Sequence, residues 1–219
     1  IHDSSFVEPY RIAIDHRGRY AYVTNSGSII VSIINLKTNK VSATKFTSAE
    51  FKARSSISGV INGFNGPSSI LLSRYFAYVT NYGLGEQDAS GNTINVVDLK
   101  INQSIDTIKV DLAPAALALS PCEKYLYCMC YVDGNPGTAI LDIISTITAD
   151  YKIIRNCDRL LILFPDSFGA FGIALSVDGC YAYVPNFGSN DFSPYGTSVS
   201  VVNLKERHIV KNIEVGIQP

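Results

Sequence analysis

Oxygen-bearing side chains in two loops are the first candidates for chemistry. Glu86, Asp88 and Asn92 lie in one Gly-rich segment, and Asp191 lies in a similar segment about a hundred residues later. Carboxylate and amide oxygens are the ligands that calcium prefers. Their spacing matches no known calcium loop, so we expect solvated loop side chains and predict no metal site.

The remaining reactive residue types also fail to form a recognisable centre. His2, His16 and His208 lie at a terminus, in a short turn and at the start of a late strand, which disfavours a three-histidine zinc site. No serine has a histidine and an aspartate in the context of a triad, and Gly83-Leu-Gly85 opens no helix that could bind a phosphate. We therefore predict no catalytic residue and no cofactor.

Five cysteines at irregular spacing give no disulfide framework. Cys128 and Cys130 are two residues apart on one predicted strand, so both sulfur atoms should lie on the same face of a sheet. A metal or redox pair is one interpretation. The expected one is two buried thiols that pack as small hydrophobic groups.

Composition restricts the classes of protein that the chain can represent. It has 219 residues, a formal net charge of −1, 17% charged residues and a mean hydropathy of +0.16. We expect one folded domain over 1–219 with no nucleic-acid partner, no membrane span and no signal peptide in the given chain. Thirteen Tyr, ten Phe and no Trp, among many Val, Ile and Thr, favour strands over helices.

A repeated pattern organises these strands. A tyrosine recurs at 22, 78, 127 and 183, each within a strand that follows another apolar strand and a short turn. Two further strands follow in every unit, and the fourth strands are predicted at 40–46, 104–110, 146–153 and 209–215. Four short strands per unit of about fifty residues indicate a β-propeller of four-stranded antiparallel blades. The blades are predicted at about 8–47, 67–110, 114–155 and 170–215.

Tyr22-Val-Thr-Asn25 and Tyr78-Val-Thr-Asn81 resemble the YVTN-family β-propeller repeat, as does the closing segment Val215-Gly-Ile-Gln-Pro219. The third unit departs from the signature with Cys128-Met-Cys130, and the fourth has Pro185 in place of Thr. The family resemblance implies a ring of the seven-bladed type, of which four repeats are visible. A small closed ring and a ring made by two chains are the alternatives, and open blades would allow self-association.

Loop length predicts a binding face. In an antiparallel meander, successive loops alternate between the two ends of the sheet, and the long segments share one parity. These segments form a predicted long-loop rim: 47–66, 82–93, 131–137, 154–169 and 187–198. Its predicted binding residues are Tyr82, Glu86, Asp88, Asn92, Phe187, Asp191, Phe192 and Tyr195, among which the aromatic residues are the anchors.

Two functions remain open at this stage. The leading hypothesis is a non-enzymatic binding or structural module that presents this rim to a protein or glycan, extracellular, at the cell surface or periplasmic, as the family resemblance implies. The alternative is a lactonase-like or dehydrogenase-like propeller enzyme with its active site at the central channel. A virion or filament subunit is a further alternative. Asn102-Gln-Ser104 is also a glycosylation sequon, in a predicted hairpin turn.

Overall fold

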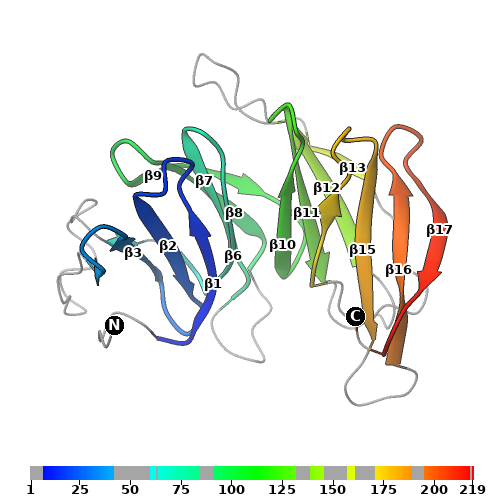
Figure 1. The fold of residues 1–219 in the computed structure, drawn as a ribbon, viewed down its shortest axis with the longest axis horizontal. Coiled ribbons are helices and arrows are strands. Elements are labelled where there is room, and N and C mark those ends of the chain that lie inside the picture. The colour runs from blue at the N-terminus through cyan, green and yellow to red at the C-terminus, as the bar shows by residue number, and fades with distance from the viewer. Residues whose placement is uncertain are drawn as a thin grey trace. The chain divides into compact units, whose positions relative to one another are not determined.

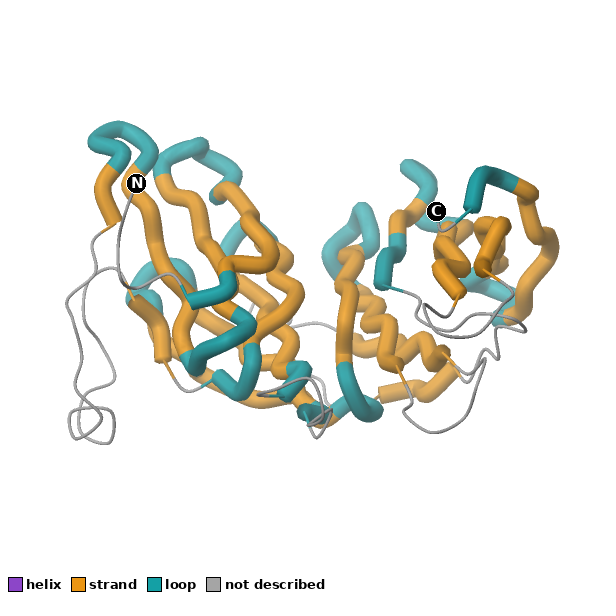
Figure 2. The backbone as a smooth tube through the Cα atoms, turned by 90° about the horizontal axis from the view of Figure 1, so that it is seen from below, coloured by secondary structure: helices purple, strands orange, loops and turns teal. Residues whose placement is uncertain are grey.

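The computed structural model describes residues 7–41, 60–62, 64–83, 91–131, 139–145, 157–160, 171–188, 195–217 and 219. Strands and turns account for all of the described regular structure, without any helix (Figure 2). The strands form four antiparallel sheets, each ordered as a meander (Figure 1). This confirms the all-β prediction of four-stranded antiparallel blades. No helix in the described part of the chain is long and apolar enough to span a membrane.

The first sheet contains β1 (Pro9–Ile14), β2 (Tyr20–Asn25), β3 (Ile30–Asn35), β4 (Lys40–Val41) and β5 (Val60–Asn62). Both β4 and β5 pair with β3: Val41 lies opposite Ile34, and Val60 lies opposite Ser32. The two short strands therefore share the fourth-strand position. The sequence predicted one continuous strand over 40–46 and a rim loop over 47–66. In the structure, β5 instead lies at the outer edge of the sheet, beside the first residues of β3. The backbone N–H and C=O groups of these residues lie beyond the reach of β4 and need hydrogen-bond partners.

The second sheet follows the sequence prediction closely. It contains β6 (Pro67–Leu72), β7 (Phe76–Asn81), β8 (Thr93–Asp98) and β9 (Gln103–Lys109). The turn between β6 and β7 lacks the Asp-Gly pair that Asp178 and Gly179 form in the turn between β14 and β15. It closes tightly through the Ser73 N–H, which donates to the Phe76 carbonyl at 2.8 Å.

The third sheet contains β10 (Pro114–Leu119), β11 (Tyr125–Tyr131), β12 (Ala139–Ser145) and β13 (Cys157–Leu160). Its fourth strand was predicted at 146–153, which lies outside the described residues. The strand that pairs with β12 is β13, in the register Asp142 to Arg159. Strand propensity alone did not show which of two neighbouring segments pairs with the edge of β12, because pairing depends on the register with the partner strand. β13 therefore lies inside the predicted rim segment 154–169, so the prediction that this whole segment is a rim loop is wrong.

The fourth sheet contains β14 (Ala174–Leu175), β15 (Tyr181–Gly188), β16 (Tyr195–Asn203) and β17 (His208–Glu214). Its first strand is only two residues long, whereas the other first strands have six. Pro185 of β15 explains the difference, because proline has no N–H to donate to a neighbouring strand. The ring of Pro185 would also lie 3.0 Å from a Cβ added at Gly172, just before β14.

The chain divides into two compact units, 1–109 and 110–219, and each has its own core. In the first unit, one face of the β1–β5 sheet packs against the β6–β9 sheet. Its buried residues are Tyr22, Val31, Ile33, Phe64, Ile70, Ala77, Val79 and Val97.

The core of the second unit lies between the β10–β13 sheet and the β14–β17 sheet. It contains Ala116, Ala118, Tyr127, Met129, Leu141, Ala182, Val184, Val202 and Leu204. The second tyrosine of the repeat differs among the sheets: Tyr22, Tyr78 and Tyr127 are buried, whereas Tyr183 is 37% exposed. Tyr183 alternates with Ala182 and Val184 along β15, so it lies on the face of the sheet that is turned away from this core.

Candidate binding surface

The signature asparagine holds the end of the blade together in three of the four sheets. Asn81, at the end of β7, is buried, and its Nδ2 donates to Thr93 Oγ1 at 2.8 Å and to Asn95 Oδ1 at 2.5 Å on β8. Its Oδ1 accepts the backbone N–H of Asn65 at 3.1 Å, in the segment that leads into β6. One side chain thus ties three parts of the chain, which satisfies buried polar groups that would otherwise be costly.

Equivalent asparagines repeat this arrangement in the first and fourth sheets. Asn25 Nδ2 donates to Ser32 Oγ at 3.1 Å, and its Oδ1 accepts the N–H of Val7 at 3.3 Å. Asn186 Nδ2 donates to Ser198 Oγ and Ser200 Oγ, both at 2.9 Å. The Oδ1 of Asn186 is buried and has no hydrogen-bond partner among the residues that the structure describes. Within that part of the chain, the fourth sheet does not show the bond by which the other two asparagines hold the segment before the first strand.

The signature threonine fills a bulge in the first strand. In the β1–β2 and β6–β7 pairs, the first strand has one residue more than the second strand between two successive paired positions, which makes a β-bulge. At the bulge of β1, Thr24 Oγ1 accepts the N–H of Arg11 at 3.0 Å. The same hydroxyl lies 2.9 Å from the carbonyl oxygen of Ser68 in the next sheet, to which it donates. Thr24 therefore supports its own blade and its contact with the neighbouring blade.

The signature tyrosine also connects neighbouring blades. The hydroxyl of Tyr22 donates to Asn102 Oδ1 at 3.2 Å, in the turn between β8 and β9. Burial raises the pKa of Tyr22 to about 12, with a smaller contribution from the charge of Asp15. Asn102 belongs to the glycosylation sequon, so its side chain is already engaged in the folded protein.

The two cysteines of the third sheet occupy the positions of the signature Val and Asn. Cys128 and Cys130 are both buried, and their sulfur atoms lie 3.7 Å apart without a disulfide bond between them. They alternate with Tyr127 and Met129 along β11 and so lie on the opposite face from the core of this unit. This geometry agrees with the interpretation of two thiols packed as small hydrophobic groups.

The predicted long-loop rim is only partly visible in the first unit. Tyr82 is half-buried, its N–H donates to the carbonyl of Gly66 at 3.0 Å, and its own carbonyl accepts the N–H of Gly91 at 3.1 Å. A Cβ at Gly91 would lie only 2.0 Å from the carbonyl oxygen of Asn81, so the loop closes where only glycine fits. Asn92 is half-buried beside this closure. Glu86 and Asp88 lie outside the described residues.

In the second unit the predicted rim starts later than expected, because the β15–β16 hairpin extends to a pair between Gly188 and Tyr195. Phe187 is half-buried and packs edge-on against Phe171, with ring centroids 6.0 Å apart. Asp191 and Phe192 lie outside the described residues, as does the side chain of Tyr195. The binding role of the eight predicted rim residues stays a prediction.

Within the part of the chain that the structure describes, no three His, Cys, Asp or Glu side chains gather closely enough to hold a metal ion. His16 Nε2 accepts a hydrogen bond from Arg17 Nε at 3.3 Å on the surface. His208 lies 3.7 Å from the carboxylate of Glu206, also on the surface. His2 is outside the described residues.

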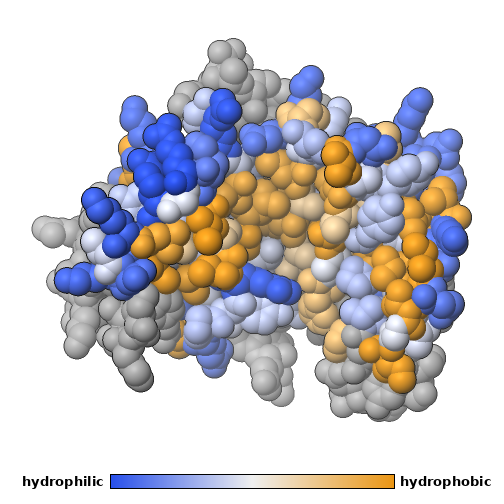
Figure 3. All heavy atoms as spheres, in the orientation of Figure 1, coloured by the Kyte–Doolittle hydropathy of each residue, from blue (hydrophilic) through white to orange (hydrophobic). Residues whose placement is uncertain are grey.

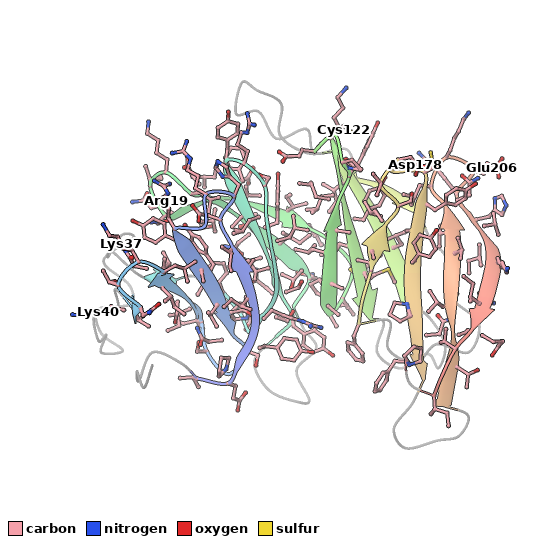
Figure 4. All side chains as sticks on the ribbon, viewed as in Figure 1. Arg19, Lys37, Lys40, Cys122, Asp178 and Glu206 are labelled. Atoms are coloured by element: carbon pink, nitrogen blue, oxygen red, sulfur yellow. The ribbon has the colours of Figure 1, made fainter. Side chains whose placement is uncertain are left out.

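A group of positive charges lies in the short turns of the first unit, which loop length alone did not indicate. We call these exposed residues the basic turn cluster: Arg17, Arg19, Lys37, Lys40, Arg74 and Lys100. Figure 4 shows Lys37 and Lys40 extending away from the β1–β5 sheet. Alternate loops of an antiparallel meander lie at the same end of the sheet. The charges of these turns in the sequence are therefore the signal by which this cluster could have been predicted.

Asp15 anchors the turn that carries Arg17 and Arg19. Its Oδ1 accepts the N–H groups of Arg19 at 2.6 Å and Tyr20 at 2.9 Å, and its Oδ2 lies 3.5 Å from Arg19 Nε. Burial alone would raise the pKa of Asp15, but the two backbone hydrogen bonds and the guanidinium of Arg19 lower it below its usual value. This buried carboxylate is therefore ionised and committed to its own turn.

Comparison with known proteins defines the fold. No protein-family model matches the chain, and no curated protein sequence matches it. Among solved structures, hydrazine synthase from Kuenenia stuttgartiensis superimposes with a TM-score of 0.70 at 20% identity, over 98% of this chain and 51% of that one. A provisionally assigned 6-phosphogluconolactonase from Bacteroides fragilis gives 0.67 at 15% identity, over 95% and 55%. The β-propeller domain of Cps50 (Swd1) from Myceliophteria thermophila gives 0.60 at 12% identity, over 99% and 58%.

These similarities show that the chain has a β-propeller fold, and the identities are too low to transfer an activity. The chain spans about half the length of the structures that it matches. Membership of the YVTN family stays a prediction.

Proposed function

We propose that this chain is a non-enzymatic binding module, a β-propeller scaffold whose blade ends contact a partner. One observation carries the proposal: the polar residues that recur from blade to blade are used to hold the scaffold. The side chains of Asn25, Asn81 and Thr24 form hydrogen bonds with their own blade or with a neighbouring blade. Recurrent residues in a reaction centre would instead leave donors or acceptors directed at a substrate.

The blade ends are the part of this fold that is free to vary. Loops can change sequence without disturbing sheet packing, and binding residues on rigid scaffolds concentrate there. The resemblance to the YVTN repeat supports a protein or glycan partner at the cell surface or in the envelope. Tyr82 and Phe187 are the described aromatic side chains that we propose as anchors, and each is half-buried against its own blade. Such anchors lose little side-chain entropy when a partner binds.

Selection from a random peptide library displayed on phage tests this proposal. We expect selected peptides to lose affinity when Tyr82 or Phe187 is replaced by alanine, by about tenfold for a true anchor. The exposed Tyr125, the first residue of β11 after the short turn from β10, supplies the control variant Tyr125→Ala, which should change affinity less than about twofold.

A parallel assay separates binding from catalysis. The purified chain should hydrolyse 6-phosphogluconolactone no faster than buffer. Hydrolysis above that rate would favour the alternative of a lactonase-like enzyme, and peptides that bind independently of both aromatic residues would contradict the proposed anchors.

A further inference from the structure

The short turns of the first unit meet at one end of its two sheets. The N–H of Leu36, in the turn after β3, donates to the carbonyl of Arg19 at 2.9 Å, in the turn after β1. In the second sheet the N–H of Leu99 donates in the same way to the carbonyl of Tyr75 at 3.0 Å. The hydrogen bond from Tyr22 to Asn102 joins the two sheets close to these turns. The four turns, 15–20, 35–40, 73–76 and 98–103, therefore form one surface.

The charge on this surface is strongly unbalanced. It carries the six exposed cations of the basic turn cluster, whereas of its two described carboxylates one is buried and the other is half-buried. Asp15 is buried and bonded to its own turn, and half-buried Asp98 accepts the N–H of Lys100 at 2.7 Å. Figure 3 shows a dense group of hydrophilic residues at this end of the first unit.

The second unit provides an internal comparison. Its described short turns, at 120–125, 176–181 and 203–208, balance their exposed charges. Three acids (Glu123, Asp178 and Glu206) accompany three bases (Lys124, Lys205 and Arg207). Among the short turns that the structure describes, the excess of positive charge is thus found in the first unit and not in the second.

Exposed apolar side chains lie beside two of the cations. Tyr75, next to Arg74, is 58% exposed, and Ile101, next to Lys100, is 48% exposed. The bond between Leu99 and the Tyr75 carbonyl holds these two turns together. Neighbouring strands are about 4.8 Å apart and packed sheets about 10 Å apart. The charges and apolar groups therefore fit within the length of a short peptide.

We infer that the basic turn cluster binds an acidic, partly hydrophobic segment of a partner protein. Complementary charge would orient and speed the encounter, and Tyr75 and Ile101 would receive an apolar side chain. A nucleic acid fits less well, because its evenly charged backbone favours an extended basic track, and the whole chain has a net charge of −1. This inference rests on the proposed binding function but uses the opposite end of the blades from Tyr82.

The test uses a fluorescein-labelled peptide of about twelve residues that repeats Glu-Asp-Glu-Phe, with fluorescence anisotropy as the readout. The cluster variant Arg17→Glu/Arg74→Glu/Lys100→Glu is compared with the control variant Lys124→Glu/Lys205→Glu/Lys211→Glu, which changes the net charge equally. We expect the cluster variant to weaken binding by about tenfold or more, and the control variant by less than about twofold. The variant Arg17→Gln/Arg74→Gln/Lys100→Gln provides a milder change if the reversal impairs folding, which far-UV circular dichroism would detect.

Further measurements fix the class of partner. Affinity should fall as salt rises from about 0.05 to 0.3 M, because exposed charges are screened. It should also fall when Tyr75→Ala removes the apolar neighbour, and when glutamine and asparagine replace the acids of the peptide.

Three results would overturn the inference: no binding of the peptide, equal loss in the cluster and control variants, or tighter binding of duplex DNA or phosphatidylserine vesicles than of the peptide. Phage-selected peptides that bind independently of Tyr82 and Phe187 would contradict the proposed anchors and leave this test unaffected, so the two proposals fail separately.

Discussion

Replacing Thr24 by valine tests how the repeat holds neighbouring blades together. Valine keeps the β-branched shape that suits β2 but removes the hydroxyl, so packing changes little. The hydroxyl is fully buried, accepts the N–H of Arg11 at 3.0 Å and donates to the Ser68 carbonyl at 2.9 Å. Both hydrogen bonds are lost in Thr24→Val.

The two lost hydrogen bonds differ in their free-energy cost. Arg11 is exposed on the first strand, so its N–H can bond to water instead, at a net cost of about 0.5–1 kcal/mol. Ser68 is buried, and its carbonyl loses a donor that water cannot easily replace, at about 1–3 kcal/mol. We therefore expect Thr24→Val to lower the free energy of unfolding by about 2 kcal/mol. For a chain of this length the melting temperature should fall by roughly 4–8 °C.

Urea unfolding followed by far-UV circular dichroism measures the change, and hydrogen exchange locates it. Exchange should increase in both β1 and β6, since the lost bonds reach both strands. Thr107→Val, at an exposed position on β9, should change stability by less than about 0.5 kcal/mol. A Thr24→Val effect no larger than that of Thr107→Val would refute the assigned role of this hydroxyl.

Three further substitutions test other parts of the scaffold. Gly196→Ala should destabilise by about 3 kcal/mol in thermal unfolding, because its Cβ would lie 1.7 Å from the Asn186 carbonyl oxygen, whereas Gly216→Ala meets nothing within 4 Å and should be nearly neutral. The pKa of Tyr22 is raised from 10.0 to about 12, so its contribution to stability is present below pH 10 and lost as pH rises to 12. Tyr22→Phe should lower the free energy of unfolding by about 1 kcal/mol at neutral pH. In urea titrations the variant should also lose less stability at alkaline pH than the original chain. Asp15 has its pKa lowered from 3.8, so its stabilisation is lost as pH falls below that value; Asp15→Asn should be less stable at neutral pH and less sensitive to acid, and equal acid sensitivity would contradict the assignment.

The internal repeat allowed much of the fold to be predicted. Signature residues mark β2, β7 and β15, and the period of the repeat places the short turns and most of the neighbouring strands. The second sheet matches the prediction in all four strands because the turns before β7 and after β8 are short and leave one register for these pairs. The interpretation of Cys128 and Cys130 as packed thiols also agrees with the structure.

The fourth strands of the first and third sheets could not be predicted in the same way. Several segments there have strand-forming composition, and the choice among them depends on which one pairs with an edge that lies far away in sequence. The sequence could not show that β5 resumes the edge begun by β4, or that β13 rather than 146–153 pairs with β12.

Amino-acid order by itself therefore determined the repeat, the all-β class and the inner strands of each blade, because these follow from local patterns of apolar and turn-forming residues. Only the tertiary structure decided what the polar residues do. Hydrogen bonds between blades commit Thr24 and Tyr22 to the scaffold, and Asp15 is withdrawn into its own turn. The same packing brings cations from four separate turns onto one surface without exposed carboxylates among its described residues. Charge balance on a surface depends on which distant residues meet there, and that is fixed only when the sheets pack together.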